Sequence, residues 1–205
     1  MTPTRIGITG GIGSGKSVVS QVLQSLGIPV FDCDAESKRL TAVHPVIRQQ
    51  LIDLVGPDVY TYNSPSDESV CNSPLNKKLL ASYLFASANH VQRVNAIIHP
   101  VLKDYFRQWV PAQNAPMVAI ESAILFEAGY DDVVDTVIMV SAPLEVRIAR
   151  AMQRDGSTRE AVEERIRQQM DDKEKCRLSQ FVIVNDGEVP VIPQVLEIIN
   201  TLSQK

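Results

Sequence analysis

Short apolar runs alternate with helical periodicity along most of this chain of 205 residues. Five runs rich in apolar and β-branched residues have the length of buried strands. They cover residues 5–9, 30–31, 117–121, 136–140 and 181–184. Helical spacing separates them, beginning at residues 17–26. The pattern predicts an α/β fold in which a parallel five-stranded sheet is covered by helices on both faces.

Residues 45–110 interrupt this alternation. Helical spacing at 47–55 is followed by a polar tract at 60–74 and by further helical spacing at 75–85, 91–98 and 101–110. No convincing strand occurs there. We therefore expect a helical domain, residues 45–110, inserted into a core made of residues 1–44 and 111–205.

Composition narrows the class of protein. Hydrophobic residues make up 44% of the chain, which is enough for a sizeable core, and the net charge is −4. That charge does not suggest nucleic acid or an anionic membrane as a partner. Cys33, Cys71 and Cys176 are odd in number and widely spaced, as in free thiols of a reducing compartment. We expect a cytoplasmic protein, a monomer or small homo-oligomer, with no nucleic-acid or membrane partner.

The strongest motif is Gly10-x-x-x-x-Gly15-Lys16-Ser17, between the first strand and the first helix. Glycines let successive backbone N–H groups point at phosphate oxygens. In this motif Lys16 would reach the terminal phosphates and the Ser17 hydroxyl would bind Mg²⁺. The sequence therefore predicts a nucleoside triphosphate and Mg²⁺, with the nucleotide held by Gly10, Gly11, Ile12, Gly13, Ser14, Gly15, Lys16, Ser17 and Val18.

Two aspartates follow the second strand. Ligands of open parallel sheets bind at the carboxyl ends of the strands, so Asp32 and Asp34 should face the terminal phosphate. A carboxylate there could accept a proton from an attacking hydroxyl or orient Mg²⁺. Alternatively, Asp34 caps the helix expected at residues 35–40.

Arg147, Arg150 and Arg154 fall on one face of the helix after the fourth strand. A turn at Asp155-Gly156 and a second helix with a Ser157-x-x-Glu160 capping box come next. Phosphoryl transfer needs positive charge on the migrating group and a segment that excludes water. We therefore expect a helical lid at about residues 147–175, with Arg150 the best candidate to contact the transferred group. The alternative is an exposed face whose arginines pair with glutamates.

The chain resembles the dephospho-CoA kinases of coenzyme A biosynthesis over nearly its whole length. The resemblance rests on the following segments: TGGIGSGKS at 9–17, FDCDAESKRL at 31–40, IIHP at 97–100, ILFE at 124–127, RAMQRD at 150–155, RIRQQ at 165–169 and FVIVNDG at 181–187. It implies a P-loop NTPase-type core with a helical insertion and a helical lid.

The resemblance also implies roles for individual residues. ATP would bind the loop at residues 10–17, and Asp34 would be the base for the ribose 3′-hydroxyl of dephospho-CoA. Lys16 and Arg150 would complete the catalytic set, and Asn185 would lie near the adenine. Dephospho-CoA would be bound by the inserted domain and by Asp32, Asp34, Lys38 and His99.

Four segments depart from the family pattern. Lys38 replaces an arginine, and Asn76 stands where an acidic residue is usual. Glu121-Ser122-Ala123 replaces an Asp-x-Pro run, and Ser179-Gln180 replaces Ala-Asp before the last strand. None of these positions lies in the glycine loop or at Asp34.

Two other functions remain open. Another small-molecule or nucleoside kinase would use the same loop and lid on a different acceptor. A GTPase-type switch has less support, because Asp53-x-x-Gly56 follows a helical pattern and Asn76-Lys77 lacks the aspartate that reads guanine.

Overall fold

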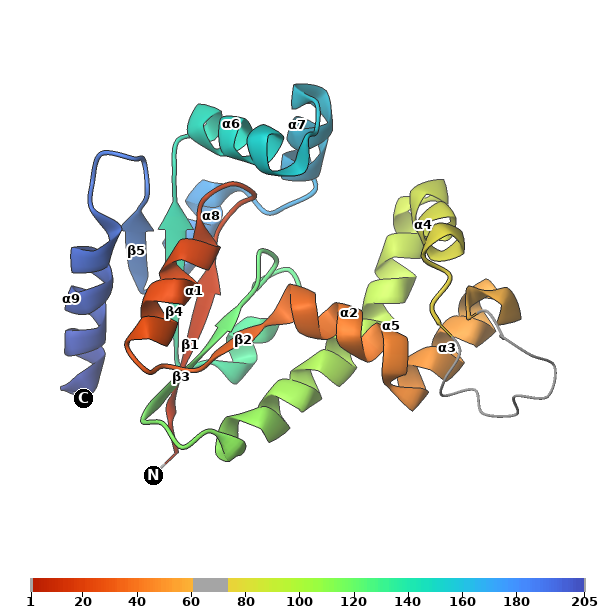
Figure 1. Cartoon of the computed structure of the whole chain (residues 1–205), viewed down its shortest axis with the longest axis horizontal. Helices are drawn as coiled ribbons and strands as arrows, with labels where there is room; N and C mark the ends of the chain where they lie inside the picture. The colour runs from red at the N-terminus through yellow and green to blue at the C-terminus, as the bar shows by residue number, and fades with distance from the viewer. Residues whose placement is uncertain (1, 61–73, 205) are drawn as a thin grey trace. The chain divides into compact units, whose positions relative to one another are not determined.

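The computed structural model describes residues 2–60 and 74–204 of the chain (Figure 1). It divides into two compact units. The sheet unit comprises Met1–Asp32 and Arg107–Lys205, and the helical unit comprises Cys33–Phe106. None of the helices in the described ranges combines the length and apolar character that a membrane span requires.

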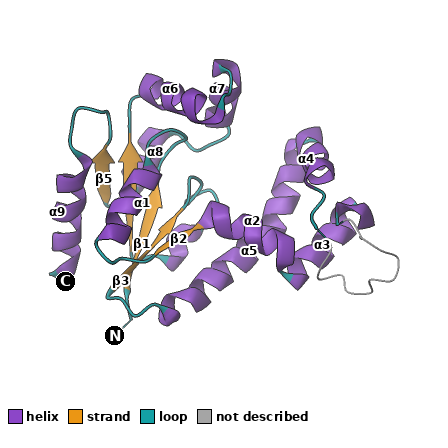
Figure 2. Cartoon of the chain, viewed as in Figure 1, coloured by secondary structure: helices purple, strands orange, loops and turns teal. Residues whose placement is uncertain are grey.

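The sheet unit is built on one parallel sheet, which confirms the α/β prediction (Figure 2). Within the described residues its five strands run in the order β2-β3-β1-β4-β5. The strands are β1 Thr4–Thr9, β2 Val30–Asp32, β3 Met117–Glu121, β4 Thr136–Ser141 and β5 Phe181–Val184. β1 therefore lies at the centre, and the loop that follows it emerges between neighbouring strands at their carboxyl ends.

Helices cover both faces of this sheet. The helices of the sheet unit are α1 Lys16–Ser25, α6 Leu144–Asp155, α7 Arg159–Arg167, α8 Asp172–Leu178 and α9 Val191–Ser203. Ile6 and Ile8 alternate along β1 and pack with Leu23 of α1 and Val195 of α9 in one buried cluster. The alternation puts these strand residues on one face, as the period of two requires.

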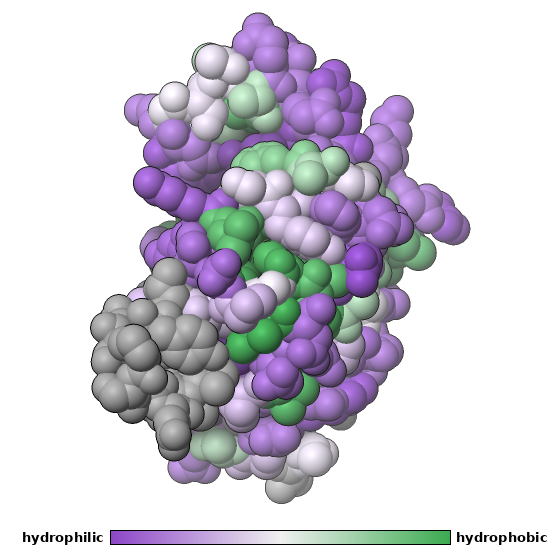
Figure 3. All heavy atoms as spheres, turned by 90° about the vertical axis from the view of Figure 1, so that its right-hand side faces the viewer, coloured by the Kyte–Doolittle hydropathy of each residue, from purple (hydrophilic) through white to green (hydrophobic). Residues whose placement is uncertain are grey.

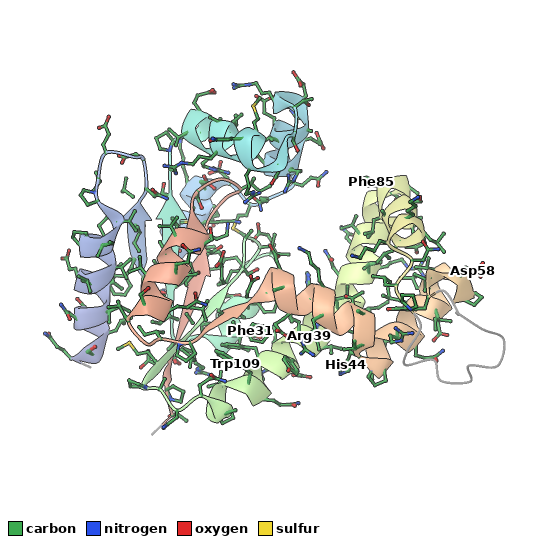
Figure 4. The ribbon with its side chains drawn as sticks, viewed as in Figure 1. Phe31, Arg39, His44, Asp58, Phe85 and Trp109 are labelled. Atoms are coloured by element: carbon green, nitrogen blue, oxygen red, sulfur yellow. The ribbon has the colours of Figure 1, made fainter. Side chains whose placement is uncertain are left out.

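Trp109 packs against Phe31 of β2. Its ring meets that of Phe31 edge-on, with the centroids 5.5 Å apart (Figure 4).

The helical unit contains α2 Cys33–Val43, α3 Pro45–Val55, α4 Lys77–Ala86 and most of α5 Ala88–Trp109. Short 3₁₀ turns lie at Pro57–Val59 in this unit and at Val110–Ala112 and Tyr130–Val133 in the sheet unit. The sequence placed the helical domain at residues 45–110, whereas the compact unit begins at Cys33 because α2 packs with α3. The assignment of this unit to substrate binding stays a prediction.

The prediction of two helices at 91–98 and 101–110 was wrong, because α5 continues through Pro100. Proline removes one backbone hydrogen bond and disfavours a helix interior. Here Val94, Ile98, Leu102 and Phe106 are all buried and recur every four residues across the proline. The burial of these four side chains outweighs the free-energy cost of the backbone hydrogen bond lost at Pro100.

A cation–aromatic contact lies inside the helical unit. The buried Arg48 guanidinium stacks 3.9 Å from the centre of the Tyr60 ring and donates to the carbonyl of Ala42 at 2.5 Å. The Tyr60 hydroxyl donates to the carbonyl of Thr41 at 2.7 Å, and burial raises the pKa of this tyrosine to about 12. These contacts join α2, α3 and the segment after α3.

Hydrophobic side chains also reach the surface of the helical unit, among hydrophilic ones (Figure 3). Among those that the structure describes, the most exposed is Phe85, 91% accessible in the last turn of α4 (Figure 4).

Two smaller expectations about the helices need correction. The cap of α7 is Thr158, not Ser157, because the Thr158 hydroxyl accepts the N–H of Ala161 at 3.3 Å. Asp34 does not cap α2, because that helix already begins at Cys33. Cys33 and Cys176 form no disulfide, and Cys71 lies outside the described residues.

Lys175 of α8 is a buried cation. Its side chain is 0% exposed, and its ammonium pairs with the Glu127 carboxylate at 2.9 Å. It also donates to the carbonyl of Ala123 at 2.6 Å. These contacts attach α8 to the segment that follows β3.

Replacing Lys175 by alanine should lower the free energy of unfolding by about 3 kcal/mol, since it removes one partner of a buried ion pair. The matched control is Arg177→Ala on the same helix. Arg177 pairs with Glu174 but its side chain is 71% exposed, so its loss should cost less than about 0.5 kcal/mol. Urea denaturation would measure both, and equal losses would contradict the buried role of Lys175.

Candidate active site

The glycine loop connects β1 to α1 and has the backbone form that its composition predicts. Gly13 and Gly15 have φ angles of 77° and 91°, in the left-handed region that favours glycine. The N–H of Ser14 donates to the carbonyl of Gly11 at 3.1 Å and closes a turn inside the loop. Lys16 and Ser17 are the first residues of α1, so the loop ends at a helix N-terminus, where backbone N–H groups favour an anion.

Lys16 lies across the loop. Its ammonium donates to the carbonyl oxygens of Gly10 at 2.9 Å and of Gly11 at 3.3 Å. The single cation of the motif is thus held beside the loop backbone rather than directed to bulk solvent.

Asn185 joins the loop to the end of β5. Its side-chain amide donates to the carbonyl of Ser14 at 2.8 Å, and its backbone N–H donates to Ser141 at 2.8 Å. A Cβ atom on Gly15 would overlap the Asn185 amide nitrogen. The placement of Asn185 near an adenine stays a prediction, but the contact with the loop was not foreseen.

The three arginines of α6 do not share one environment, and the lid at about residues 147–175 stays a prediction. Arg147 is buried, 4% exposed, and donates from Nε to the carbonyl of Ile12 at 3.0 Å. Burial lowers the pKa of its guanidinium, while nearby Asp171 opposes that shift. Arg150 donates to the carbonyl of Asn185 at 2.8 Å. Arg154 is exposed and pairs with Asp155.

Other arginines of the helix pair α6–α7 follow the alternative that sequence analysis left open. Arg159 pairs with both Glu145 and Glu163, and Arg167 pairs with Glu164. Solvent-exposed pairs of this kind add little stability. The contact of Arg150 with a transferred group stays a prediction.

Two carboxylates stand at the carboxyl ends of neighbouring strands. Asp32 of β2 and Glu121 of β3 are opposite each other in the parallel register. The Ser20 hydroxyl of α1 donates to the Glu121 carboxylate at 2.5 Å. Since Ser20 follows Ser17 by one helical turn, the longer side chain of Glu121 is oriented by the same helix that begins at the loop.

Hard oxygen donors are the chemistry that Mg²⁺ prefers, and it usually takes one or two carboxylates together with phosphate and water. Ser17, Asp32 and Glu121 supply such donors. The described residues contain no cluster of three or more His, Cys, Asp and Glu that could hold a metal alone. This donor set fits a metal that arrives with a nucleotide, rather than one held in an all-protein cage.

Three of the predicted acceptor residues, Asp34, Lys38 and His99, belong to the helical unit, whereas Asp32 ends a strand of the sheet unit. Asp34 and Lys38 are exposed on α2 and lie four residues apart, on one face of the helix. His99 lies in the middle of α5, where burial and the charge of Lys103 lower its pKa. Both effects favour the neutral form of its imidazole.

Two of the departures from the family pattern support the backbone. Asn76 caps α4 by accepting the N–H of Leu79 at 3.1 Å. Gln180 pairs with Val137 through both its side chain and its backbone, at 2.7 and 3.1 Å. Asn76 thus provides a hydrogen-bond acceptor for an N–H in the first turn of α4. Gln180 provides hydrogen-bond partners for the backbone of Val137, near the start of β4.

Sequence analysis assigned no role to Ser20 or to Gln169, which accepts the N–H of Ile12 at 3.1 Å. Gln169 lies in the RIRQQ segment, but its partner is 157 residues away. Only the one-turn spacing from Ser17 could have suggested Ser20.

Replacing Gly13 by alanine should abolish nucleotide binding, because the added Cβ would overlap the backbone carbonyl of Arg147. The control is Gly27→Ala. Gly27 has a similar φ of 80° but nothing within 4 Å of the added atom. Both variants should lose about 1 kcal/mol of stability from backbone strain.

Isothermal titration with ATP would check this prediction. It requires normal affinity in Gly27→Ala and loss of binding in Gly13→Ala. Normal ATP affinity in Gly13→Ala would show that the loop tolerates displacement from Arg147.

A central strand, a glycine loop entering a helix, and carboxylates at the ends of the neighbouring strands define a P-loop protein of the kinase type. The sequence comparisons give the family. A model of the dephospho-CoA kinase family matches residues 4–190, so the chain belongs to that family.

Individual relatives agree with the family assignment. A dephospho-CoA kinase of Bacteroides fragilis is 52% identical over 202 residues, which cover 98% of this chain and 94% of the relative. One of Porphyromonas gingivalis is 42% identical over 201 residues, covering 98% and 95%. A crystal structure of a Thermus thermophilus protein superposes with a TM-score of 0.81 at 30% identity, covering 98% of each chain.

Proposed function

We propose that this chain phosphorylates dephospho-CoA with ATP, and that the acceptor is the ribose 3′-hydroxyl, giving coenzyme A and ADP. The observation that carries the proposal is the folded glycine loop in a chain of the dephospho-CoA kinase family. Because the phosphoryl group carries its own negative charge, catalysis of its transfer consists mainly of positioning and charge stabilisation.

The donor half of the reaction belongs to the sheet unit. Backbone N–H groups of the loop and of the first turn of α1 would bind the phosphates of ATP. Lys16 would leave its loop carbonyls for the terminal phosphates, an exchange that costs two hydrogen bonds to neutral groups and gains contacts with an anion. Arg150, held by Asn185, would place a further positive charge near the transferred group.

Ser17, Asp32 and Glu121 would hold Mg²⁺ together with the nucleotide. The ion would offset negative charge on the phosphate oxygens. Ser20 would keep the Glu121 carboxylate oriented through its hydrogen bond.

The acceptor half belongs to the helical unit. Asp34, an exposed carboxylate on α2, would accept or orient the proton of the 3′-hydroxyl. Lys38, on the same helix face, would attract the phosphates of dephospho-CoA. Neutral His99 would offer a hydrogen bond rather than a charge. The cytoplasmic location and the monomer or small oligomer stay predictions.

A coupled assay with ATP, Mg²⁺ and a panel of acceptors tests the proposal. ADP should form with dephospho-CoA and not with nucleosides, shikimate or coenzyme A itself, which already carries the 3′-phosphate. Preference for a nucleoside or shikimate would identify another small-molecule kinase. ADP release without any acceptor would indicate a nucleotide-hydrolysing switch.

Substituting Asp34 by asparagine should lower turnover about 100-fold, the scale of general-base catalysis, while ATP affinity stays within twofold. Asp53→Asn is the matched control, since Asp53 is an exposed carboxylate of the same unit. Steady-state kinetics and ATP titration would measure both variants. Near-normal turnover in Asp34→Asn would reject Asp34 as the base.

A further inference from the structure

The outer arm of the glycine loop, Gly11-Ile12-Gly13, is held by side chains from distant parts of the sheet unit. The N–H of Ile12 donates to Gln169 Oε1 at 3.1 Å, and the carbonyl of Ile12 accepts Arg147 Nε at 3.0 Å. One residue of the loop therefore has both of its backbone polar groups bound by side chains. The N–H and the carbonyl of Ile12 would otherwise need water or a neighbouring loop atom as hydrogen-bond partner. The two side chains fix the directions of both groups.

Steric contact reinforces these hydrogen bonds. A Cβ atom on Gly11 would overlap the Arg147 guanidinium, and one on Gly13 would overlap the Arg147 carbonyl. The two glycines are thus required by the closeness of one arginine, as well as by their own backbone angles. The outer arm of the loop therefore packs directly against Arg147.

Arg147 is itself held in place. Its Nη1 pairs with the carboxylate of Asp172, the first residue of α8, and the side chain is almost wholly buried. A guanidinium offers several donors in a fixed plane, so one group can serve Ile12 and Asp172 at once. Lysine could not make both contacts with the same geometry.

The apolar side chain of Ile12 completes the attachment. It packs against the small core of the helix pair α6–α7, formed by Ile148, Ala151 and Val162. If the helix pair α6–α7 moved away from the loop, Ile12 would be exposed and its contact with Arg147 would be broken at the same time. The loop and the base of the helix pair are therefore one packed body.

We propose that Arg147, Gln169 and Asp172 form a clamp that holds Gly11-Ile12-Gly13 in the nucleotide-binding form, making them positioning residues for ATP. The proposal rests on ATP as the donor bound by this loop. A loop that is ordered before binding does not have to lose conformational freedom when the phosphates arrive. The clamp thus affects nucleotide affinity, and the acceptor chemistry belongs to other residues.

The test uses Arg147→Met, Arg147→Lys and Gln169→Met in the full-length chain, with Arg154→Met as control. Arg154 lies on the same helix, but its side chain is exposed and pairs with Asp155. Methionine keeps the apolar stem of each side chain and removes its hydrogen bonds. Isothermal titration gives the ATP dissociation constant, and steady-state kinetics give kcat at saturating ATP.

Each clamp variant should raise the ATP dissociation constant about tenfold or more, the scale of one lost hydrogen bond to a charged or fixed group. At saturating ATP, kcat should fall by a much smaller factor. Arg147→Lys should not restore affinity, and Arg154→Met should bind ATP normally. A loss of kcat equal to the loss of affinity would overturn a purely positioning role.

The double variant Arg147→Met/Gln169→Met supplies a readout that general destabilisation would not give. Both side chains hold the same residue, so the double variant should lose less affinity than the product of the single losses. If Arg147→Met does not fold, Gln169→Met alone decides, since Gln169 is only half-buried. Unchanged ATP affinity in folded Gln169→Met would overturn the clamp.

ATP binding is measured without an acceptor, so the two proposals fail separately. A wild-type chain that binds ATP but does not phosphorylate dephospho-CoA would reject the proposed function. The clamp would still be judged by its variants. Normal phosphorylation with unaltered ATP affinity in Gln169→Met would reject the clamp alone.

Discussion

Close packing of the glycine loop against its own protein is the constraint on which the rest of this structure depends. The loop contacts Arg147 on one side and Asn185 on the other, through positions where only glycine leaves room. Those two residues come from α6 and from the end of β5. In the sheet β4, which precedes α6, pairs with β1, and β5 pairs with β4, so the geometry of the phosphate site is a property of the whole sheet unit.

The charged residues of the site also come from several elements of the sheet unit. Lys16 and Arg150 are both bound to backbone carbonyls at the loop or beside it. The carboxylates Asp32 and Glu121 stand at the ends of β2 and β3, on the other side of β1. Cations and anions are thus separated along the carboxyl edge of the sheet, which suits a ligand that brings both phosphate and metal ion.

Much of this arrangement could be predicted from the sequence, because it depends on local pattern. The five strands, the helix after the loop and the helix that starts at Pro45 follow from short-range periodicity and turn chemistry. The glycine loop was recognisable because its function requires fixed residue types at fixed spacing. Asp34 and Arg150 could be proposed because they stand near strand ends or on a regular helix face.

The errors came where long-range packing decides. Arg147 has the same spacing as Arg150 and Arg154, yet its burial depends on Asp172 and Ile12, which are 25 and 135 residues away. Pro100 ended a helix in the sequence prediction, but buried side chains on both sides of it keep α5 continuous. Periodicity reports which face a residue occupies and not what covers that face.

The attachment of Ile12 to the helix pair α6–α7 also affects whether the glycine-loop motif can be transferred to another protein. Residues 10–17 match a pattern shared by many nucleotide-binding chains, which suggests a self-contained module. In this chain the unspecified positions of the pattern carry an isoleucine that completes a remote core and glycines that clear one particular arginine. A graft of these eight residues onto another parallel sheet would reproduce the signature but leave Ile12 uncovered and its backbone groups without their partners.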